Sequence, residues 1–111
     1  ENTDKAIISS TKELLMAMIN DNMIDHAKIS AILFTATKDL DAAYPAQAAR
    51  DIGLNDIALM CLQEMFVVDS LSMCIRIMIM WNTEKNHADL VPVYLRGAKA
   101  LRPDITKGYK Q

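Results

Sequence analysis

The sequence has few of the residues on which most catalytic centres depend. Its 111 residues include only two cysteines, two histidines and three glycines. It contains no C-x-x-C pair, no glycine-rich phosphate loop and no Ser–His–Asp or Cys–His set of a covalent nucleophile. These absences argue against phosphoryl transfer, hydride transfer and nucleophilic chemistry, and against a bound metal or cofactor.

An excess of charge of one sign is also missing. The net charge is −2 and no block of like charges occurs, so the chain lacks the basic face that binds nucleic acid. No signal peptide and no apolar segment of membrane-spanning length is evident. Cys61 and Cys74 lie in apolar segments, where a free thiol behaves as a small hydrophobic side chain. We therefore expect a cytoplasmic protein that binds neither nucleic acid nor a membrane.

The sequence does contain enough apolar material for one folded domain. Apolar residues make up 51% of the chain and charged residues 23%, which is typical of an ordered globular protein. A chain of this length suits a single domain with a modest core. We expect residues 1–111 to form that domain, with 103–111 as a mobile tail.

Periodicity predicts one long helix, one short helix and four strands. Apolar residues recur every three or four positions over 2–22, which is the pattern of an amphipathic helix. Pro45 and Gly53 are typical of the start and the end of a short helix over 44–53. Strands are expected where β-branched and apolar residues cluster, over 29–37, 57–65, 73–81 and 91–95, with a loop after the last.

This order of elements predicts an α+β fold, a mixed sheet with one long helix packed on one face. The segments 57–65 and 73–81 are apolar on both faces, so we expect them in the middle of the sheet, joined by a hairpin or a short connection. One long helix covers only one face of such a sheet. We therefore expect partner subunits on the other face, in a homo-oligomer with a site at the joint.

Two charged residues, Glu64 and Arg76, interrupt these apolar segments. Because side chains alternate along a strand, each of them points into apolar surroundings. A buried charge is costly unless an opposite charge pairs with it. One interpretation is structural: the two residues pair with each other or reach solvent at a strand end. The other is functional: they flank a pocket with little water, where an arginine stabilises a developing negative charge.

Four segments of the sequence, in order from Thr3 to Asp104 with the stretches between them, resemble the trimeric α+β class of bacterial chorismate mutases: SAILFTATKDLDAAYPAQAAR, CLQEM, CIRIMIM and VYLRGAKALRPD. The resemblance implies a homotrimer whose sheets form a pseudo-α/β-barrel, with active sites between neighbouring subunits. It also implies the rearrangement of chorismate to prephenate, on the route to phenylalanine and tyrosine. That reaction needs no cofactor and no nucleophile, which agrees with the missing motifs.

The resemblance assigns roles by position. Arg76 matches the arginine aimed at the ether oxygen, Glu64 the carboxylate that accepts a hydrogen bond from the ring hydroxyl, and Cys61 a thiol beside the same group. Tyr94 matches a tyrosine that contacts a substrate carboxylate. The other substrate-binding positions are Leu59, Met60, Leu62 and Gln63 on the strand, Tyr44, Ala46 and Arg50 in a wall from the adjacent subunit, and Leu101 and Arg102 near the entrance.

The sequence departs from the family pattern at three places. It begins after the family's first strand, whose RGAxT motif supplies an arginine for a substrate carboxylate, so either that start is missing or the chain is a truncated form. Gln47 stands where members often have lysine, and FVVDSLS (66–72) where many have a glycine-rich turn. The alternative functions are a non-catalytic trimer of the same fold that binds small carboxylates, and a purely structural subunit.

Overall fold

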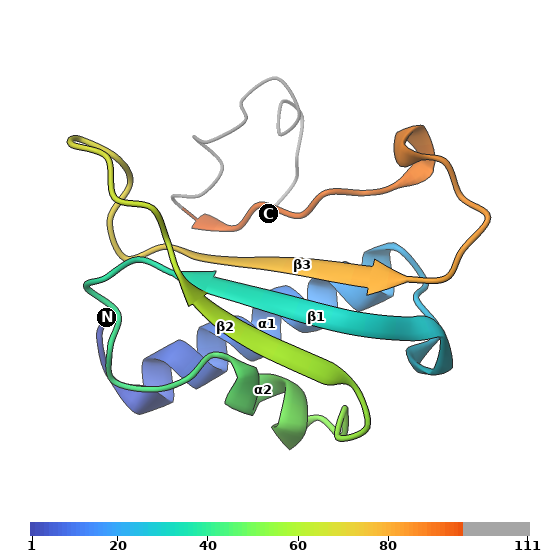
Figure 1. Cartoon of the computed structure of the whole chain (residues 1–111), viewed down its shortest axis with the longest axis horizontal. Coiled ribbons are helices and arrows are strands. Elements are labelled where there is room, and N and C mark those ends of the chain that lie inside the picture. Colours follow the sequence, from blue (N-terminus) through green and yellow to red (C-terminus); the bar gives the residue numbers. More distant parts are fainter. Residues whose placement is uncertain (97–111) are drawn as a thin grey trace.

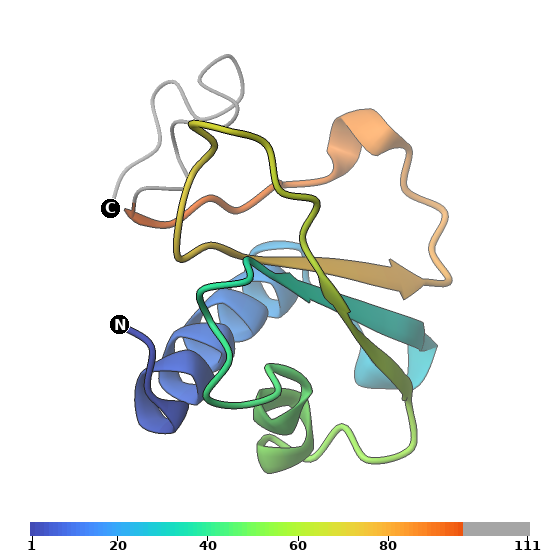
Figure 2. The ribbon, with the colours of Figure 1, turned by 60° about the vertical axis from the view of Figure 1, so that its left-hand side comes forward.

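A computed structural model describes residues 1–96 as a three-stranded sheet with two α-helices on one face (Figures 1 and 2). The α+β class and the mixed sheet predicted from the sequence are confirmed. The elements follow in the order α1 (Asp4–Asp21), β1 (Ile29–Ala36), α2 (Ala46–Asp51), β2 (Ala58–Gln63) and β3 (Ile75–Trp81), with short 3-10 turns at His26–Lys28 and His87–Asp89.

Helix α1 forms where the apolar period of three to four residues predicts it. Thr3 caps its first turn, because the Thr3 hydroxyl accepts a hydrogen bond from the backbone N–H of Ala6 at 3.1 Å. One stripe of the helix is buried, and the hydroxyl of Thr11 within that stripe donates to a backbone carbonyl one turn earlier. The buried stripe consists of Ile7, Thr11, Leu15 and Ile19.

Helix α2 is short and packs closely because its buried side chains are small. Pro45 precedes its first residue, and Gly53 follows it with a φ of 94°. That positive φ is accessible to glycine without strain, so Gly53 ends the helix at the predicted place. The buried residues of α2 are Ala46, Ala48 and Ala49.

The sheet has the strand order β2-β1-β3, with β1 parallel to β2 and antiparallel to β3. The prediction that residues 57–65 and 73–81 lie in the middle of the sheet is therefore wrong for the described residues, and the two strands do not form a hairpin. An apolar pattern reports that both faces of a strand are apolar, and it does not report whether both edges are paired. The central strand is β1.

The strand predicted over residues 91–95 does not form. Pro92 has no N–H to donate, and both backbone groups of Val91 are bonded to the Asn22 side chain, at 2.7 Å to Oδ1 and 2.9 Å from Nδ2. The segment instead runs back along β3 toward the start of that strand (Figure 1). The predicted loop beyond residue 96 and the tail over 103–111 lie outside the described residues.

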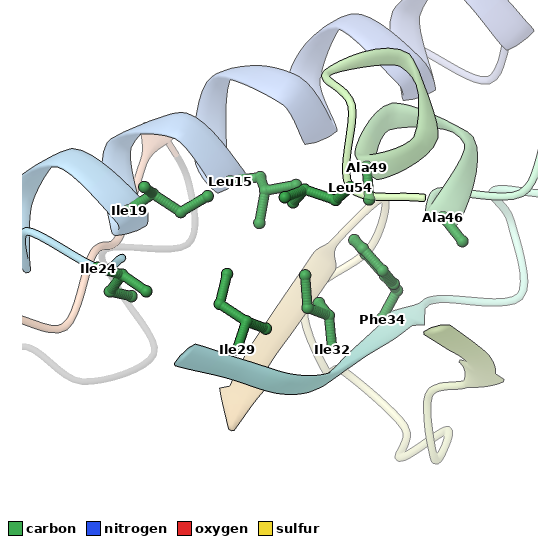
Figure 3. Packing of buried hydrophobic residues seen from close by; sticks show 9 residues of the cluster. All are labelled: Leu15, Ile19, Ile24, Ile29, Ile32, Phe34, Ala46, Ala49 and Leu54. Atoms are coloured by element: carbon green, nitrogen blue, oxygen red, sulfur yellow. The ribbon is translucent and has the colours of Figure 1, made fainter. Parts of the chain in front are cut away.

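The core lies between the two helices and the face of the sheet that they cover (Figure 3). Leu15 and Ile19 of α1 point toward Ile29 and Ile32 of β1. Phe34 of β1 points toward Ala49 of α2, and Ala46 lies at that end of the cluster. Burial of these apolar side chains is the main term that stabilises the fold.

The other face of the sheet is not covered by any described residue of the same chain, and it is called the open face below. Met60 and Met78 on this face are 57% and 62% exposed, an unusual state for large apolar side chains in a row. The open face consists of Ala31, Leu33, Thr35, Ala58, Met60, Leu62, Arg76, Met78 and Met80.

Candidate active site

The ends of three strands bring together residues that are distant in sequence. Because β3 runs opposite to β1 and β2, its first residues lie at the same end of the sheet as the last residues of the other two (Figure 1). Thr35 of β1 is in register with Leu62 on one side and Arg76 on the other. Glu64 follows β2, and its backbone N–H donates to the carbonyl of Ala36 at 2.8 Å. Glu64 and Arg76, 12 positions apart, therefore meet.

Glu64 accepts hydrogen bonds from two side chains. Nη2 of Arg76 donates to Oε1 of Glu64, and the hydroxyl of Thr35 donates to Oε2. The side chain of Glu64 is only 12% exposed, whereas that of Arg76 is 61% exposed. The two charges pair as the structural interpretation expects, but the exposure of Arg76 shows that this is not a buried ion pair. The carboxylate is held inside, and the guanidinium faces outward.

Arg76 lines two adjacent cavities. The larger, of about 390 Å³, lies between α1, the start of β3 and the segment 92–96, and Tyr94 also lines it. The smaller, of about 260 Å³, is bounded by Glu64, the loop that follows it, Lys38 and Asp39. Small-molecule sites are typically roughly 300 to 1,000 Å³ and mostly apolar with a few polar groups, which fits this end of the sheet.

A clamp of hydrogen bonds fixes the start of β3. The backbone N–H of Thr37 donates to the carbonyl of Cys74 at 3.0 Å, and the backbone N–H of Cys74 donates to the Thr37 hydroxyl at 3.0 Å. Both carboxylate oxygens of Asp39 accept from the backbone N–H of Met73, at 3.1 and 3.0 Å. Met73 has a φ of 47°, which is costly for a side chain other than glycine. The clamp holds this turn and so fixes the backbone from which β3 and Arg76 continue.

The same hydrogen bonds change the acidity of two groups. The hydroxyl of Thr37 lowers the pKa of Asp39 below its ordinary value of 3.8, and the backbone N–H of Met73 acts in the same direction. Burial raises the pKa of the Cys74 thiol, and the Asp39 carboxylate adds to the rise. Cys74 is therefore a protonated, unreactive thiol at neutral pH rather than a nucleophile.

Three predicted site residues point away from Arg76. Cys61 is in register with Phe34, and Leu59, two positions earlier on β2, is in register with Ile32. Both side chains pack against the core. Along a strand, an odd separation of three positions places Cys61 and Glu64 on opposite faces. Ala46 is buried in the core of its own chain, 5% exposed. The structure therefore does not bring the Cys61 thiol to the Glu64 carboxylate, and the Ala46 side chain does not form an outer wall.

Other predicted residues surround the pair or lie elsewhere on the surface. Met60 and Leu62 share the open face with Arg76, and Gln63 is exposed at the end of β2. Tyr94 is half-buried beside the larger cavity.

Tyr44 and Arg50 are exposed, Tyr44 by 74%, and neither lines a cavity that contains Arg76 of the same chain. Leu101 and Arg102 lie outside the described residues.

Sequence reasoning missed several residues of this site. Thr35 contacts Glu64 directly, Thr37 and Asp39 form the clamp, and the Lys38 ammonium lies 3.9 Å from the ring centroid of Phe66. Alternation along β1 tells which face of the sheet Thr35 is on. Only the strand order shows that β3, which carries Arg76, lies beside β1. The clamp joins two turns and leaves no periodic signal.

Residues 1–96 contain neither a metal-binding cluster nor a membrane-spanning helix. No group of three or more His, Cys, Asp or Glu side chains in this range is arranged to hold a metal ion. None of the helices in the same range has the length and apolar character needed to cross a membrane.

Comparison with known proteins agrees with the geometry. Residues 1–105 match the family model described as chorismate mutase type I. Chorismate mutase AroH of Thermus thermophilus is 42% identical over 106 residues, covering 95% of this chain and 87% of the relative, and its namesake of Bacillus subtilis is 35% identical over 105 residues, covering 94% and 83%. A solved chorismate mutase from Clostridium thermocellum superimposes with a TM-score of 0.88 at 47% identity, covering 90% of this chain and 89% of that one. The chain thus belongs to the chorismate mutase type I family.

Proposed function

We propose that the chain catalyses the rearrangement of chorismate to prephenate, as an isomerase of aromatic amino acid biosynthesis. Family membership supports the reaction. The observation that carries it to this chain is the Glu64–Arg76 pair, in which a fixed carboxylate holds an outward-facing guanidinium beside two cavities.

The reaction breaks one carbon–oxygen bond and forms one carbon–carbon bond within the same molecule, so no proton, electron or group enters or leaves. Negative charge collects on the ether oxygen as its bond lengthens. A guanidinium already aimed at that oxygen favours the transition state over the ground state. We assign this role to Arg76, and assign to Glu64 the acceptance of a hydrogen bond from the substrate's ring hydroxyl.

The site must also hold chorismate in its compact, reactive conformer, because the extended form cannot react. We assign to Tyr94, which lines the larger cavity together with Arg76, a contact with one substrate carboxylate. Met60 and Leu62 on the open face provide apolar contact for the ring, and Gln63 lies at the end of the same strand. Leu101 and Arg102 remain proposals for the entrance, drawn from the family resemblance.

We further propose that the active unit is a homotrimer. The exposed apolar side chains of the open face, Met60, Leu62, Met78 and Met80, support burial against other copies of the chain. In such a trimer Tyr44 and Arg50 reach the site of a neighbouring copy. For Cys61 and Leu59 we propose a packing role on the core side of β2, in place of a side-chain contact with the substrate, and likewise for Ala46 in α2.

We propose a cytoplasmic location, and the state of the two cysteines supports it. Cys61 and Cys74 are both free thiols in the described part of the chain, a state maintained in a reducing compartment.

The direct test follows the loss of ultraviolet absorbance when chorismate is mixed with the purified chain, with prephenate identified by chromatography. The matched control is Arg76→Ala at the same concentration. Analytical ultracentrifugation checks that the variant has the same oligomeric state as the unmodified chain. Turnover that disappears in Arg76→Ala supports the proposal. Absence of turnover in the unmodified trimer, with chorismate still bound, would instead support a non-catalytic binding protein.

A further inference from the structure

The hydroxyl of Thr35 is the third member of the charged cluster at the end of the sheet. It donates its one proton to Oε2 of Glu64, on the side of the carboxylate opposite the oxygen that Arg76 contacts. Thr35 lies on the central strand, β1. On one side of it is β3, which carries Arg76, and on the other is β2, which Glu64 follows. Its backbone is fixed by strands on both sides, so its hydroxyl is a rigid donor.

The three residues differ in their freedom to move. Glu64 is held through its backbone bond to Ala36 and through the Thr35 hydroxyl, and its side chain is nearly buried. The Arg76 head is mostly exposed and has Glu64 as its one ionic partner among residues 1–96. The direction of the guanidinium therefore depends on where the carboxylate stands. The carboxylate in turn depends on Thr35.

We propose that Thr35 is a positioning residue of the chorismate mutase reaction: its hydroxyl fixes the Glu64 carboxylate, which in turn aims Arg76 at the substrate. The inference rests on the proposed function, because it assigns Thr35 a part in that same site. A carboxylate has about four lone-pair positions. With one taken by Thr35 and one by Arg76, Glu64 still accepts a hydrogen bond from the substrate's hydroxyl without turning.

The positioning role requires a hydroxyl at residue 35, which only serine or threonine provides in this place. Packing in the strand requires only the shape of the side chain. Thr35→Val keeps the β-branched shape and removes the donor. Because a hydrogen bond to a charged group is among the stronger ones, we expect its loss here to lower kcat by about 10-fold or more. The loss is expected mainly in kcat, with a smaller change in KM, because Arg76 acts on charge that develops in the transition state.

The variants separate positioning from packing. Thr35→Ser keeps the donor and should restore kcat to within about 2-fold of the unmodified chain. Thr35→Ala removes the same hydroxyl from a smaller side chain and should give a loss like that of Thr35→Val. Ser30→Ala removes a hydroxyl at the far end of β1, where it donates to the Met80 carbonyl at 3.0 Å, and should leave kcat unchanged.

A double-mutant cycle with Glu64→Ala tests whether Thr35 acts through Glu64. Once the carboxylate is gone, Thr35→Val should lower kcat by less than about 2-fold further. The cycle uses Thr35→Val, or Thr35→Ala if only the latter keeps the circular dichroism spectrum of the unmodified chain. Additive losses in the cycle, or full activity in both Thr35→Val and Thr35→Ala, would overturn the proposal.

A second readout does not depend on turnover. The ¹³C chemical shift of the Glu64 carboxyl carbon should move in Thr35→Val and return in Thr35→Ser. If that shift moves as expected while the unmodified chain shows no turnover, the proposed function fails and the Thr35–Glu64 contact stands. If turnover is normal and the shift does not move in Thr35→Val, the contact is absent and the positioning role is refuted.

Discussion

Replacing Arg76 should separate its effect on the rate from its effect on folding. Its side chain is 61% exposed, so its ion pair with Glu64 is screened by solvent and is worth about 1 kcal/mol or less to the folded state. Glu64 keeps the hydrogen bond from Thr35 when Arg76 is removed. We therefore expect Arg76→Ala to lower the free energy of unfolding by only about 1 kcal/mol.

The cost in the transition state is larger. Loss of one donor that is fixed before the reaction typically costs about 2.7 to 4 kcal/mol, which is roughly 100- to 1,000-fold in kcat. Arg76→Lys should show a loss of kcat in the same range. An ammonium lacks the planar fork with which a guanidinium donates to the Glu64 carboxylate and to the substrate oxygen at the same time.

The assay compares initial rates of chorismate loss for the unmodified chain, Arg76→Ala and Arg76→Lys, beside urea unfolding of each. A loss of rate under about 10-fold in a folded Arg76→Ala chain would refute the assignment of Arg76 as the main electrostatic catalyst. A loss of rate that simply tracks loss of folded protein would refute the separation argued above.

Three further changes test other parts of the structure. Replacing Glu64 by Leu and Arg76 by Met together should abolish turnover while the free energy of unfolding stays within about 1 kcal/mol of the original or rises; turnover that survives in the folded double variant would favour a purely structural role for the pair. Asp39→Asn should destabilise the fold most at neutral pH, since the lowered pKa of Asp39 means that its ionised form stabilises the folded state above its ordinary value of 3.8, and this stabilisation is lost as the pH falls through the lower folded-state pKa. Urea unfolding at pH 7 and pH 3 measures that difference, and an equal effect at both pH values would contradict the role given to the Thr37 and Met73 hydrogen bonds. Thr3→Ala should cost about 1 kcal/mol by removing the cap of α1, and an unchanged urea midpoint would show that the cap is not needed.

Periodic features of the sequence were sufficient to predict most elements of this fold. The spacing of Ile7, Thr11, Leu15 and Ile19 predicted α1, and Pro45 with Gly53 predicted the position of α2. These signals are local, since each depends on residues within one element. The false strand over 91–95 shows the limit: its apolar residues fit a strand, but the Asn22 side chain, 69 positions away, occupies the backbone groups of Val91.

The candidate site was predicted less completely because it depends on strand order. Glu64 and Arg76 were identified as charges in apolar segments, and the structure brings them together. Thr35 was missed because nothing in the sequence states that β1 lies between β2 and β3. The position of Cys61, in contrast, was open to correction from the sequence alone. An odd separation from Glu64 along one strand already places its thiol on the other face.

The loop between Glu64 and Arg76 is tied to the sheet at both of its ends. Glu64 is bonded to Ala36 where the loop leaves, and the clamp of Thr37 with Cys74 holds it where it returns. Between these anchors the chain turns outward, with Met65 and Val68 largely exposed to solvent. The geometry of the Glu64–Arg76 pair is therefore insulated from the length and sequence of the loop. This stretch can diverge among relatives, or carry an engineered insertion, while the distance between carboxylate and guanidinium remains a property of the sheet.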